Sequence, residues 1–252
     1  MTAASDVILA TEGVGKNFGG FQALRDVSVE FRRGKLTAII GPNGAGKSTY
    51  FNVLSGAFPP STGRILFEGR DLSRARPHSF ARAGIAKSFQ ITNVFPELTA
   101  QENVRVAIQA VHRRFELFRH RRAFPELYDE ADRLLASVGL GDRRLRRARE
   151  LAHGEQRSLE VAMALACRPK LLLLDEPTAG MSPEETREMM GLIERLAAER
   201  TVILVEHKMK LVMGLCQRLI VLHHGELLAE GTPDDIRAND EVRRVYLGQG
   251  AH

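Results

Sequence analysis

Three nearly continuous apolar runs are the feature that most constrains how this 252-residue chain can fold. They are LTAII at residues 36–40, KLLLLDE at 170–176 and TVILVE at 201–206. A strand with one solvent-exposed face alternates apolar and polar residues, whereas a strand covered by helices on both faces is apolar throughout. The runs therefore predict a buried parallel sheet with helices packed on both sides, as in an α/β domain.

Two other parts of the chain have different patterns. VSVEF at residues 27–31 and ILFE at 65–68 alternate apolar and polar residues, which predicts a half-buried antiparallel β layer. Helix signals dominate from residue 99 to 167, beginning with TAQE at 99–102, which has the pattern of a capping box. An apolar stripe at helical spacing follows at Val104, Ile108 and Val111. We expect an α/β core with an antiparallel β subdomain and an inserted α-helical subdomain.

The whole chain, residues 1–252, is expected to form one domain, because a single core reaches about 250 to 300 residues. Helix starts are also predicted later in the chain. Ser182, Pro183 and Glu185 supply a cap, a proline at the first position and a glutamate at the third, and TPDD at 232–235 repeats that pattern. The expected divisions are the core with its β subdomain at 1–90 and 168–230, the helical subdomain at 91–167 and a C-terminal helical tail at 231–252.

Composition excludes several classes of protein. The chain is 44% hydrophobic, yet no apolar run approaches the roughly 18 to 20 residues that span a bilayer. The N-terminus lacks the basic and hydrophobic segments of a signal peptide, so we expect a soluble, cytoplasmic chain. Cys167 and Cys216 are too far apart for a zinc site or a disulfide framework, and we expect core or helix-face thiols. The net charge of +5 suits an anionic partner without identifying it.

The sequence GPNGAGKST fits the phosphate-loop pattern G-x-x-x-x-G-K-[ST] and predicts a P-loop NTPase core of the RecA-like type. An apolar run precedes it and a helical stretch follows, so backbone N–H groups and a positive helix end converge on the phosphates. Lys47 is expected to reach the β- and γ-phosphates, Ser48 to offer its hydroxyl to magnesium and Thr49 to hold an α-phosphate oxygen. The alternative is a chance glycine-rich turn. The expected nucleotide-binding residues are Gly41, Pro42, Asn43, Gly44, Ala45, Gly46, Lys47, Ser48 and Thr49.

A pair of carboxylates, Asp175 and Glu176, closes the second apolar run. Open α/β sheets bind their ligands at this end of the strands. Asp175 is expected to hold magnesium through a water, and Glu176 to polarise the water that attacks the γ-phosphate. The alternative is that both carboxylates are solvated and cap the helix that follows.

The stretch LAHGEQ at residues 151–156 resembles the LSGGQ signature of the ABC transporter ATPases, and further motifs appear in that family's order. Phe18 in KNFGG matches the aromatic that stacks on adenine, and Gln90 in KSFQ matches the glutamine that ligates magnesium and signals to a membrane partner. His207 matches the histidine that contacts the γ-phosphate. In isolation these residues are more simply a core phenylalanine, a surface glutamine and a structural histidine, but their order favours the family roles.

The resemblance implies bound ATP and Mg²⁺ and three sets of site residues. In the family, the signature completes the ATP site of a partner subunit. The implied catalytic residues are Lys47, Gln90, Glu176 and His207. The implied magnesium ligands are Ser48, Gln90 and Asp175. The implied signature contacts are Ala152, His153, Gly154, Glu155 and Gln156.

Two motifs depart from the family pattern. Ala152 replaces the signature serine, so one hydroxyl donor to the partner's γ-phosphate is missing, and His153 replaces a glycine. A helix expected to start near Glu155 still offers backbone N–H groups to phosphate. His153 either adds charge to that contact or points away from it. AGMS at residues 179–182 lacks the aspartate of the D-loop pattern SALD, so coupling between two ATP sites through that residue is in doubt.

Arginine-rich stretches at residues 113–122 and 143–149 admit two interpretations. One is a nucleic-acid clamp. The second is a solvated face next to anionic lipid, which we favour because no aromatic platform or nucleic-acid motif accompanies the charge.

Within the family, FGGFQAL, NVFPELTAQENV, AGMSPEET and EHKMKLVM resemble ATP-binding subunits of branched-chain amino acid importers. Urea and amide importers share several of these segments. Lys208 departs from the acidic residue expected after the histidine. The resemblance implies ATP hydrolysis at the cytoplasmic face of the membrane by a peripheral subunit. The implied partners of this subunit are a second, different ATPase subunit in a head-to-tail pair and two permeases, which residues 90–103 would contact and move. A solute-binding protein is an indirect partner.

Two competing functions fit parts of the same pattern. One is a non-transport ABC ATPase acting on nucleic acid, although such proteins usually carry a long coiled-coil insertion or a duplicated ATPase domain, and neither fits in 252 residues. The second is a switch that binds ATP without turnover, which leaves Glu176 unexplained. The transported solute stays open, because the ATPase subunit does not touch it.

Overall fold

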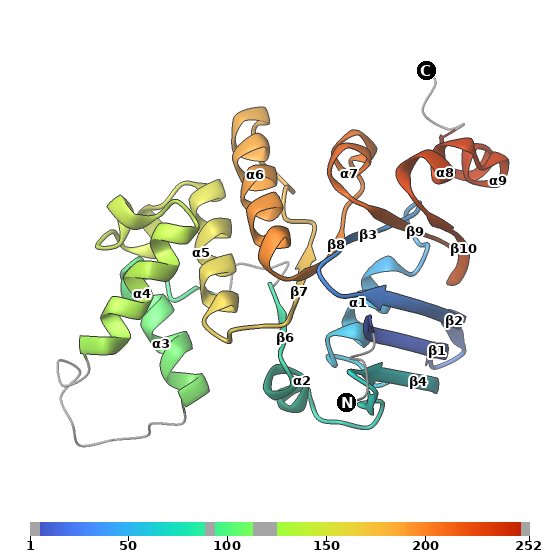
Figure 1. Cartoon of the computed structure of the whole chain (residues 1–252), viewed down its shortest axis with the longest axis horizontal. Helices are drawn as coiled ribbons and strands as arrows, with labels where there is room; N and C mark the ends of the chain where they lie inside the picture. Colours follow the sequence, from blue (N-terminus) through green and yellow to red (C-terminus); the bar gives the residue numbers. More distant parts are fainter. Residues whose placement is uncertain (1–5, 89–93, 113–124, 248–252) are drawn as a thin grey trace.

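The computed structural model describes residues 6–88, 94–112 and 125–247. A six-stranded sheet forms the centre, with the strand order β10-β9-β3-β8-β7-β6 (Figure 1). All pairs are parallel except β9 with β10, and every residue of β3, β7 and β8 is buried. This confirms the parallel sheet predicted from the apolar runs, although two strands end one residue earlier than the runs. The strands are β3 (Leu36–Ile40), β6 (Ile85–Lys87), β7 (Leu171–Asp175), β8 (Thr201–Val205), β9 (Arg218–His223) and β10 (Glu226–Gly231).

A second, antiparallel sheet has the order β2-β1-β4-β5 and confirms the predicted β layer. Helix α1 (Lys47–Leu54) packs between the two sheets: Tyr50 and Phe51 are fully buried in one cluster with Ile39 of β3 and Phe31 of the antiparallel sheet. The two sheets therefore share a core that fixes α1 at the end of β3. The strands are β1 (Val7–Phe18), β2 (Phe21–Arg32), β4 (Thr62–Phe67) and β5 (Arg70–Asp71).

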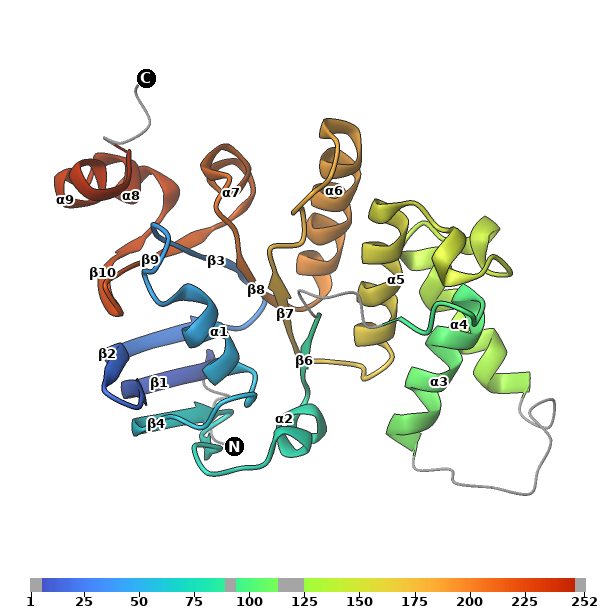
Figure 2. The ribbon, with the colours of Figure 1, turned by 180° about the vertical axis from the view of Figure 1, so that it is seen from behind.

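Three helices lie together at one end of the molecule, beyond the edge of the central sheet (Figures 1 and 2). They are α3 (Ala100–His112), α4 (Pro125–Ser137) and α5 (His153–Leu165), with short 3₁₀ turns at Gly141–Arg143 and Ala148–Glu150. They form the inserted helical part of the predicted fold class. The remaining helices are α2 (Pro77–Ala83), α6 (Pro183–Glu199), α7 (Met209–Leu215), α8 (Pro233–Ala238) and α9 (Asp240–Val242), followed by a π-type turn at Arg243–Leu247.

The predicted capping boxes are present. The backbone N–H of Glu102 donates to Oγ1 of Thr99 at 3.1 Å, and the Glu102 carboxylate accepts from the N–H of Thr99. Ser182 with Glu185, and Thr232 with Asp235, make the same reciprocal bonds. On α3 the expected stripe residues Val104 and Ile108 are fully buried. The side chain of Val111 is not among those that the structure describes.

Both cysteines are free thiols, Cys216 buried and Cys167 half-buried, as expected. Within the described ranges, no helix is both long and apolar enough to cross a bilayer.

Candidate nucleotide-binding site

The phosphate loop connects β3 to α1 and wraps tightly because of its glycines. Gly41 and Gly46 have φ angles of 151° and 94°. A Cβ on Gly41 would lie 2.2 Å from the carbonyl oxygen of Leu222, and one on Gly46 would lie 2.9 Å from that of Ala23. Side chains at these positions would push the loop away from the sheet.

Lys47 is buried beneath this loop. Its Nζ donates to the carbonyl oxygens of Gly41 at 2.8 Å and Pro42 at 2.9 Å. Burial lowers the pKa of Lys47, and the negative charge of Glu176 opposes part of that shift. The ammonium is therefore held by carbonyls of the loop, within the electrostatic reach of Glu176. Ser48 is exposed and Thr49 is half-buried in the first turn of α1, where the positive helix end favours an anion.

The sequence did not indicate that the β9–β10 turn supports the phosphate loop. Gly225 donates its N–H to the carbonyl of Ala45 at 3.0 Å and accepts from the N–H of Arg25 at 2.8 Å. A Cβ on Gly225 would lie 2.5 Å from the carbonyl oxygen of Ala23. Gly225, in the sequence HHGE at residues 223–226, indicates a turn, but no neighbouring residue indicates that this turn contacts the phosphate loop.

Asp175 ends β7 and is only 3% exposed. Its Oδ1 is buried without a hydrogen-bond partner, and its Oδ2 lies 3.8 Å from Nζ of Lys87. Burial raises the pKa of Asp175, the neighbouring Glu176 raises it further, and Lys87 and Arg157 oppose the shift. An unsatisfied buried carboxylate oxygen is costly unless a cation or donor joins it, so this position fits a magnesium ligand.

Glu176 follows in a left-handed conformation with φ of 45°, which is strained for a residue with a side chain. Its N–H donates to the carbonyl of Val205, and its carbonyl accepts from Ala179 at 3.0 Å. The alternative that these carboxylates cap the next helix is wrong, because α6 begins only at Pro183 and is capped by Ser182.

His207 follows β8, and its Nδ1 lies 3.9 Å from Oε1 of Glu176. Beside it, the fully buried Glu206 accepts from the hydroxyl of Thr178 and from the N–H groups of His207 at 2.9 Å and Lys208 at 3.2 Å. The Lys208 ammonium donates to the carbonyl of Thr178 at 3.0 Å, so this departure from the family pattern ties two loops together. Sequence reasoning missed Glu206, although its place beside His207 was a signal.

Phe18 ends β1 and is 42% exposed, so the alternative of a core phenylalanine is wrong. Its ring packs edge-on against Phe58 with 5.5 Å between centroids, and Nζ of Lys16 lies 5.1 Å from its centroid. The exposed part of the ring could stack on a base. Gln90 lies outside the described residues.

The signature motif, residues 151–156, starts α5 at His153 rather than near Glu155 as expected. Ala152 has no side-chain cap to offer, and the Glu155 carboxylate instead accepts from the Ala152 N–H at 2.9 Å. Gln156 donates to the carbonyls of Ala148 and Leu151. The Gly154 N–H, an expected contact of the partner's phosphate, donates to the Glu185 carboxylate at 3.1 Å in the single chain.

His153 is exposed, and its Nε2 lies 3.2 Å from the carbonyl oxygen of Ala179. The ring therefore contacts the loop after Glu176 within the same subunit, and its effect on a partner's phosphate stays a prediction. In both views α6 and β7 separate α5 from α1 along the long axis of the molecule, so the signature motif lies apart from the chain's own phosphate loop (Figures 1 and 2).

A strand–loop–helix phosphate site with Asp175, Glu176 and His207 at the carboxyl ends of neighbouring parallel strands is the geometry of a nucleotide hydrolase. The sequence model of the ABC transporter family matches residues 24–179. This chain belongs to the ABC transporter family. A second model, for the branched-chain amino acid ATP-binding cassette transporter, matches residues 226–252.

Relatives and solved structures agree with this ABC assignment. The chain is 41% identical to the high-affinity branched-chain amino acid transport ATP-binding protein LivG of Salmonella typhimurium, over 97% of this chain and 99% of that protein. It matches a nucleotide-free ATP-binding cassette from an ABC transporter with a TM-score of 0.84 and 29% identity, over 95% of this chain and 98% of the solved chain. A dimeric post-hydrolysis cassette bound to ADP and Pi matches with a TM-score of 0.75 and 25% identity, over 89% and 98%. The chain is therefore an ATP-binding, ATP-hydrolysing ABC cassette.

In this ABC ATPase the arginine-rich stretch at 143–149 is balanced by nearby carboxylates. Arg143 lies 3.2 Å from Glu155 and Arg144 lies 3.8 Å from Asp132. Glu97 lies within 3.6 Å of Arg147 and 2.7 Å of Arg149. Local ion pairs reduce the field available to a polyanion, so this surface does not favour a nucleic-acid clamp. The stretch at 113–122 lies outside the described residues.

Proposed function

We propose that this chain is the ATP-hydrolysing subunit of an importer for branched-chain amino acids, acting peripherally at the cytoplasmic face of the membrane. The observation that carries this proposal is the near full-length similarity to LivG, together with the C-terminal match to the branched-chain amino acid transporter model. A urea or amide importer is the runner-up, because ATPase subunits of such importers share sequence segments with this chain.

The working unit is a head-to-tail pair of ATPase subunits. The separation of the signature motif from the chain's own phosphate loop supports this arrangement, since a second subunit must bring its phosphate loop to residues 151–156. A structural neighbour solved as a dimer bound to ADP and Pi supports it too. We propose that the second subunit is a different ATPase chain.

ATP binds with its base on Phe18 and its phosphates in the loop at residues 41–49. Lys47 lies inside the curve of that loop and faces the β- and γ-phosphates when it exchanges its carbonyl partners for phosphate oxygens. Ser48 and Asp175 would hold Mg²⁺, with Gln90 as a third ligand implied by the family. When bound, Mg²⁺ neutralises the charge that develops on the phosphates.

Glu176 acts on the attacking water, and His207 on the γ-phosphate. The strained backbone of Glu176 is fixed by bonds to Val205 and Ala179, and its carboxylate lies 3.9 Å from Nδ1 of His207. Glu206 fixes the backbone at His207. These contacts orient both groups before substrate arrives, and general-base assistance of this kind contributes about 10²- to 10⁴-fold to rate.

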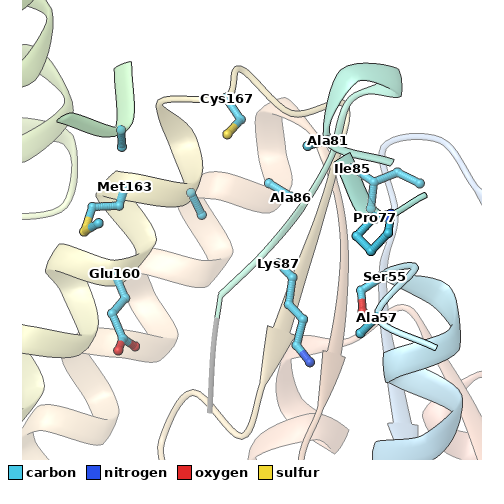
Figure 3. Close-up of a pocket in the computed structure, with 12 residues that line it drawn as sticks. Ser55, Ala57, Pro77, Ala81, Ile85, Ala86, Lys87, Glu160, Met163 and Cys167 are labelled. Atoms are coloured by element: carbon cyan, nitrogen blue, oxygen red, sulfur yellow. The ribbon is translucent and has the colours of Figure 1, made fainter. Parts of the chain in front are cut away.

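A cavity of about 350 Å³ between the core and the helical part fits a short apolar segment of the permease. Lys87 of β6 and Glu160 of α5 are the charged residues that line it, and Figure 3 shows both side chains. Lys87 also donates to Oδ1 of Asn52 on α1 at 2.6 Å and approaches Asp175, so this wall of the cavity adjoins the ATP site. The other lining residues are mainly apolar: Ser55, Ala57, Pro77, Ala81, Ile85, Ala86, Ala107, Met163, Ala164 and Cys167.

Purification of the tagged chain from detergent-solubilised membranes tests the proposal. We expect two permeases and a second ATPase subunit to copurify, and the associated solute-binding protein to retain leucine, isoleucine or valine. Retention of urea or a short amide instead would favour the runner-up. A chain that stays out of the membrane fraction and whose ATPase rate rises with DNA would contradict transport.

A further inference from the structure

One carboxylate connects the signature motif to the loop that follows Glu176. The N–H of Gly154, in the first turn of α5, donates to Oε1 of Glu185 at 3.1 Å. The other oxygen of Glu185 accepts from the N–H of Ser182 at 2.9 Å. Helices α5 and α6 lie side by side in both views, and the Glu185 side chain therefore caps both of them (Figures 1 and 2).

A second contact joins the same two segments. Nε2 of His153 lies 3.2 Å from the carbonyl oxygen of Ala179, and since a carbonyl only accepts, Nε2 donates here. The N–H of Ala179 donates in turn to the carbonyl of Glu176 at 3.0 Å. The first helical residue of the signature motif is thus two hydrogen bonds from the backbone of Glu176.

The Glu185 carboxylate holds a position suited to phosphate. N–H groups in the first turn of a helix favour an anion, and in the free subunit that anion is Glu185 itself. Its bonds to Ser182 and Gly154, and the neighbouring His153, lower the pKa of Glu185 and keep it ionised. A Cβ on Gly154 would lie 2.9 Å from Oε1, so the glycine permits this close approach.

The carboxylate also has room to leave. Gly154 and Glu185 line a cavity of about 540 Å³ together with Ala152 and Glu155. Rotation about the side-chain bonds can withdraw Oε1 from Gly154, and an oxygen can still cap Ser182.

We propose that Glu185 is a positioning residue that occupies the Gly154 N–H in the free subunit and gives it up to a phosphate of the ATP held by the partner. This inference rests on the proposed head-to-tail pair. Glu185 thereby sets the ATP concentration at which the pair closes, because its negative charge competes with the phosphate. When Glu185 releases Gly154, the signature motif moves relative to the loop after Glu176, to which His153 is also bonded. Closure of the pair at one ATP site is thereby linked to the catalytic residue of the other. This link replaces the one that the D-loop aspartate, absent from this chain, supplies in the family pattern.

The test compares Glu185→Gln with Glu184→Gln in the assembled transporter, by phosphate release against ATP concentration. Glu184 is the matched control: it lies in the same helical turn, with its side chain 79% exposed and paired with Arg187 at 3.7 Å. We expect Glu185→Gln to lower the half-saturating ATP concentration by about three- to tenfold, the effect of one charge-assisted hydrogen bond, and Glu184→Gln to leave it unchanged.

A shorter acid at position 185 distinguishes the effect of the bond to Gly154 from the effect of the negative charge. Glu185→Asp keeps an acid that can cap Ser182, as Asp235 caps Thr232 in this chain, but its side chain is too short to reach Gly154. We expect it to lower the half-saturating ATP concentration as well. Binding of a fluorescent ATP analogue to the isolated chain, which reports its own phosphate loop, should not change in either variant.

Equal half-saturation in wild type, Glu185→Gln and Glu184→Gln would overturn the proposal, as would a rise in Glu185→Gln. Wild-type assembly without any ATPase activity would instead overturn the proposed function, so the two failures are distinguishable.

Discussion

Nδ1 of His207 lies 3.9 Å from Oε1 of Glu176, a separation longer than a hydrogen bond. The same nitrogen lies 3.9 Å from Oε2 of the buried Glu206. The two proposed hydrolytic groups are thus close enough to act on one γ-phosphate and its attacking water, while Glu206 and Thr178 fix the backbone beneath them.

Thr178→Val should destabilise the chain and slow turnover. The Thr178 hydroxyl donates to the buried Glu206 carboxylate, and valine would leave that oxygen without its donor, at a cost of about 1–3 kcal/mol. Urea unfolding measures the loss, and phosphate release measures the effect on His207. Thr62→Val, at an exposed position of β4, is the control and should change the free energy of unfolding little. Equal stabilities of the two variants would argue against this support of the site.

Glu176 should control the pH at which Lys47 stops attracting ATP. Burial lowers the pKa of Lys47 below its usual 10.5, and the Glu176 charge raises part of it back, so Glu176→Gln lowers this pKa further. Since only the ammonium form attracts phosphate, binding of a fluorescent ATP analogue should weaken at lower pH in Glu176→Gln than in wild type. Glu188→Gln, on the exposed side of α6, should follow the wild-type curve. A shift of the Glu176→Gln curve to higher pH would refute the electrostatic link.

Asp175→Asn should remove the effect of Mg²⁺ without harming the ligand-free fold. Because burial raises the pKa of Asp175, the folded state binds more protons than the unfolded state between the usual 3.8 and the raised value, and stability falls as pH rises through that window. At neutral pH the ionised group costs stability, so the ligand-free variant should melt at the same temperature or higher, by about 2–4 °C per kcal/mol. In the variant, Mg²⁺ should then add nothing to the melting-temperature increase caused by ATP. If Mg²⁺ raises the melting temperature of the ATP-bound variant as much as that of the wild type, Asp175 is not a ligand.

Phe18→Ala should weaken ATP binding by about 1–3 kcal/mol, the value of one base–aromatic stack. Phe18→Tyr keeps the ring and should bind normally. Phe21→Ala removes a more exposed phenylalanine, 67% exposed, from the same hairpin and serves as the control. Calorimetric titration with ATP and with triphosphate alone separates the base contact from the phosphate contacts. Equal losses for both ligands would place the effect elsewhere.

Features encoded by local pattern were predictable from the sequence. The apolar runs revealed β3, β7 and β8 because burial on both faces demands apolar residues throughout. Reciprocal caps such as Thr99 with Glu102 need only three residues of separation. The phosphate loop was recognisable for the same reason, since its glycines, lysine and hydroxyls are contiguous.

Contacts between distant residues were not predictable. Gly154 and Glu185 are 31 positions apart, and neither residue type signals the bond. The support of Ala45 by Gly225 likewise depends on how β9 and β10 pair. The start of α5 was placed too late because Ala152 carries no capping group, and the Glu155 carboxylate reaches back to it instead. The division of the chain at 1–90, 91–167, 168–230 and 231–252 stays a prediction.

Uptake of radiolabelled leucine by vesicles that contain the purified assembly, with ATP on the side of this subunit, tests the central claim most directly. We expect wild-type assembly to accumulate leucine, and Glu176→Gln assembly to bind ATP while losing at least about 100-fold in uptake rate, because general-base assistance is worth at least that much. Leucine uptake that is unchanged in Glu176→Gln would contradict the claim that hydrolysis by this chain powers import.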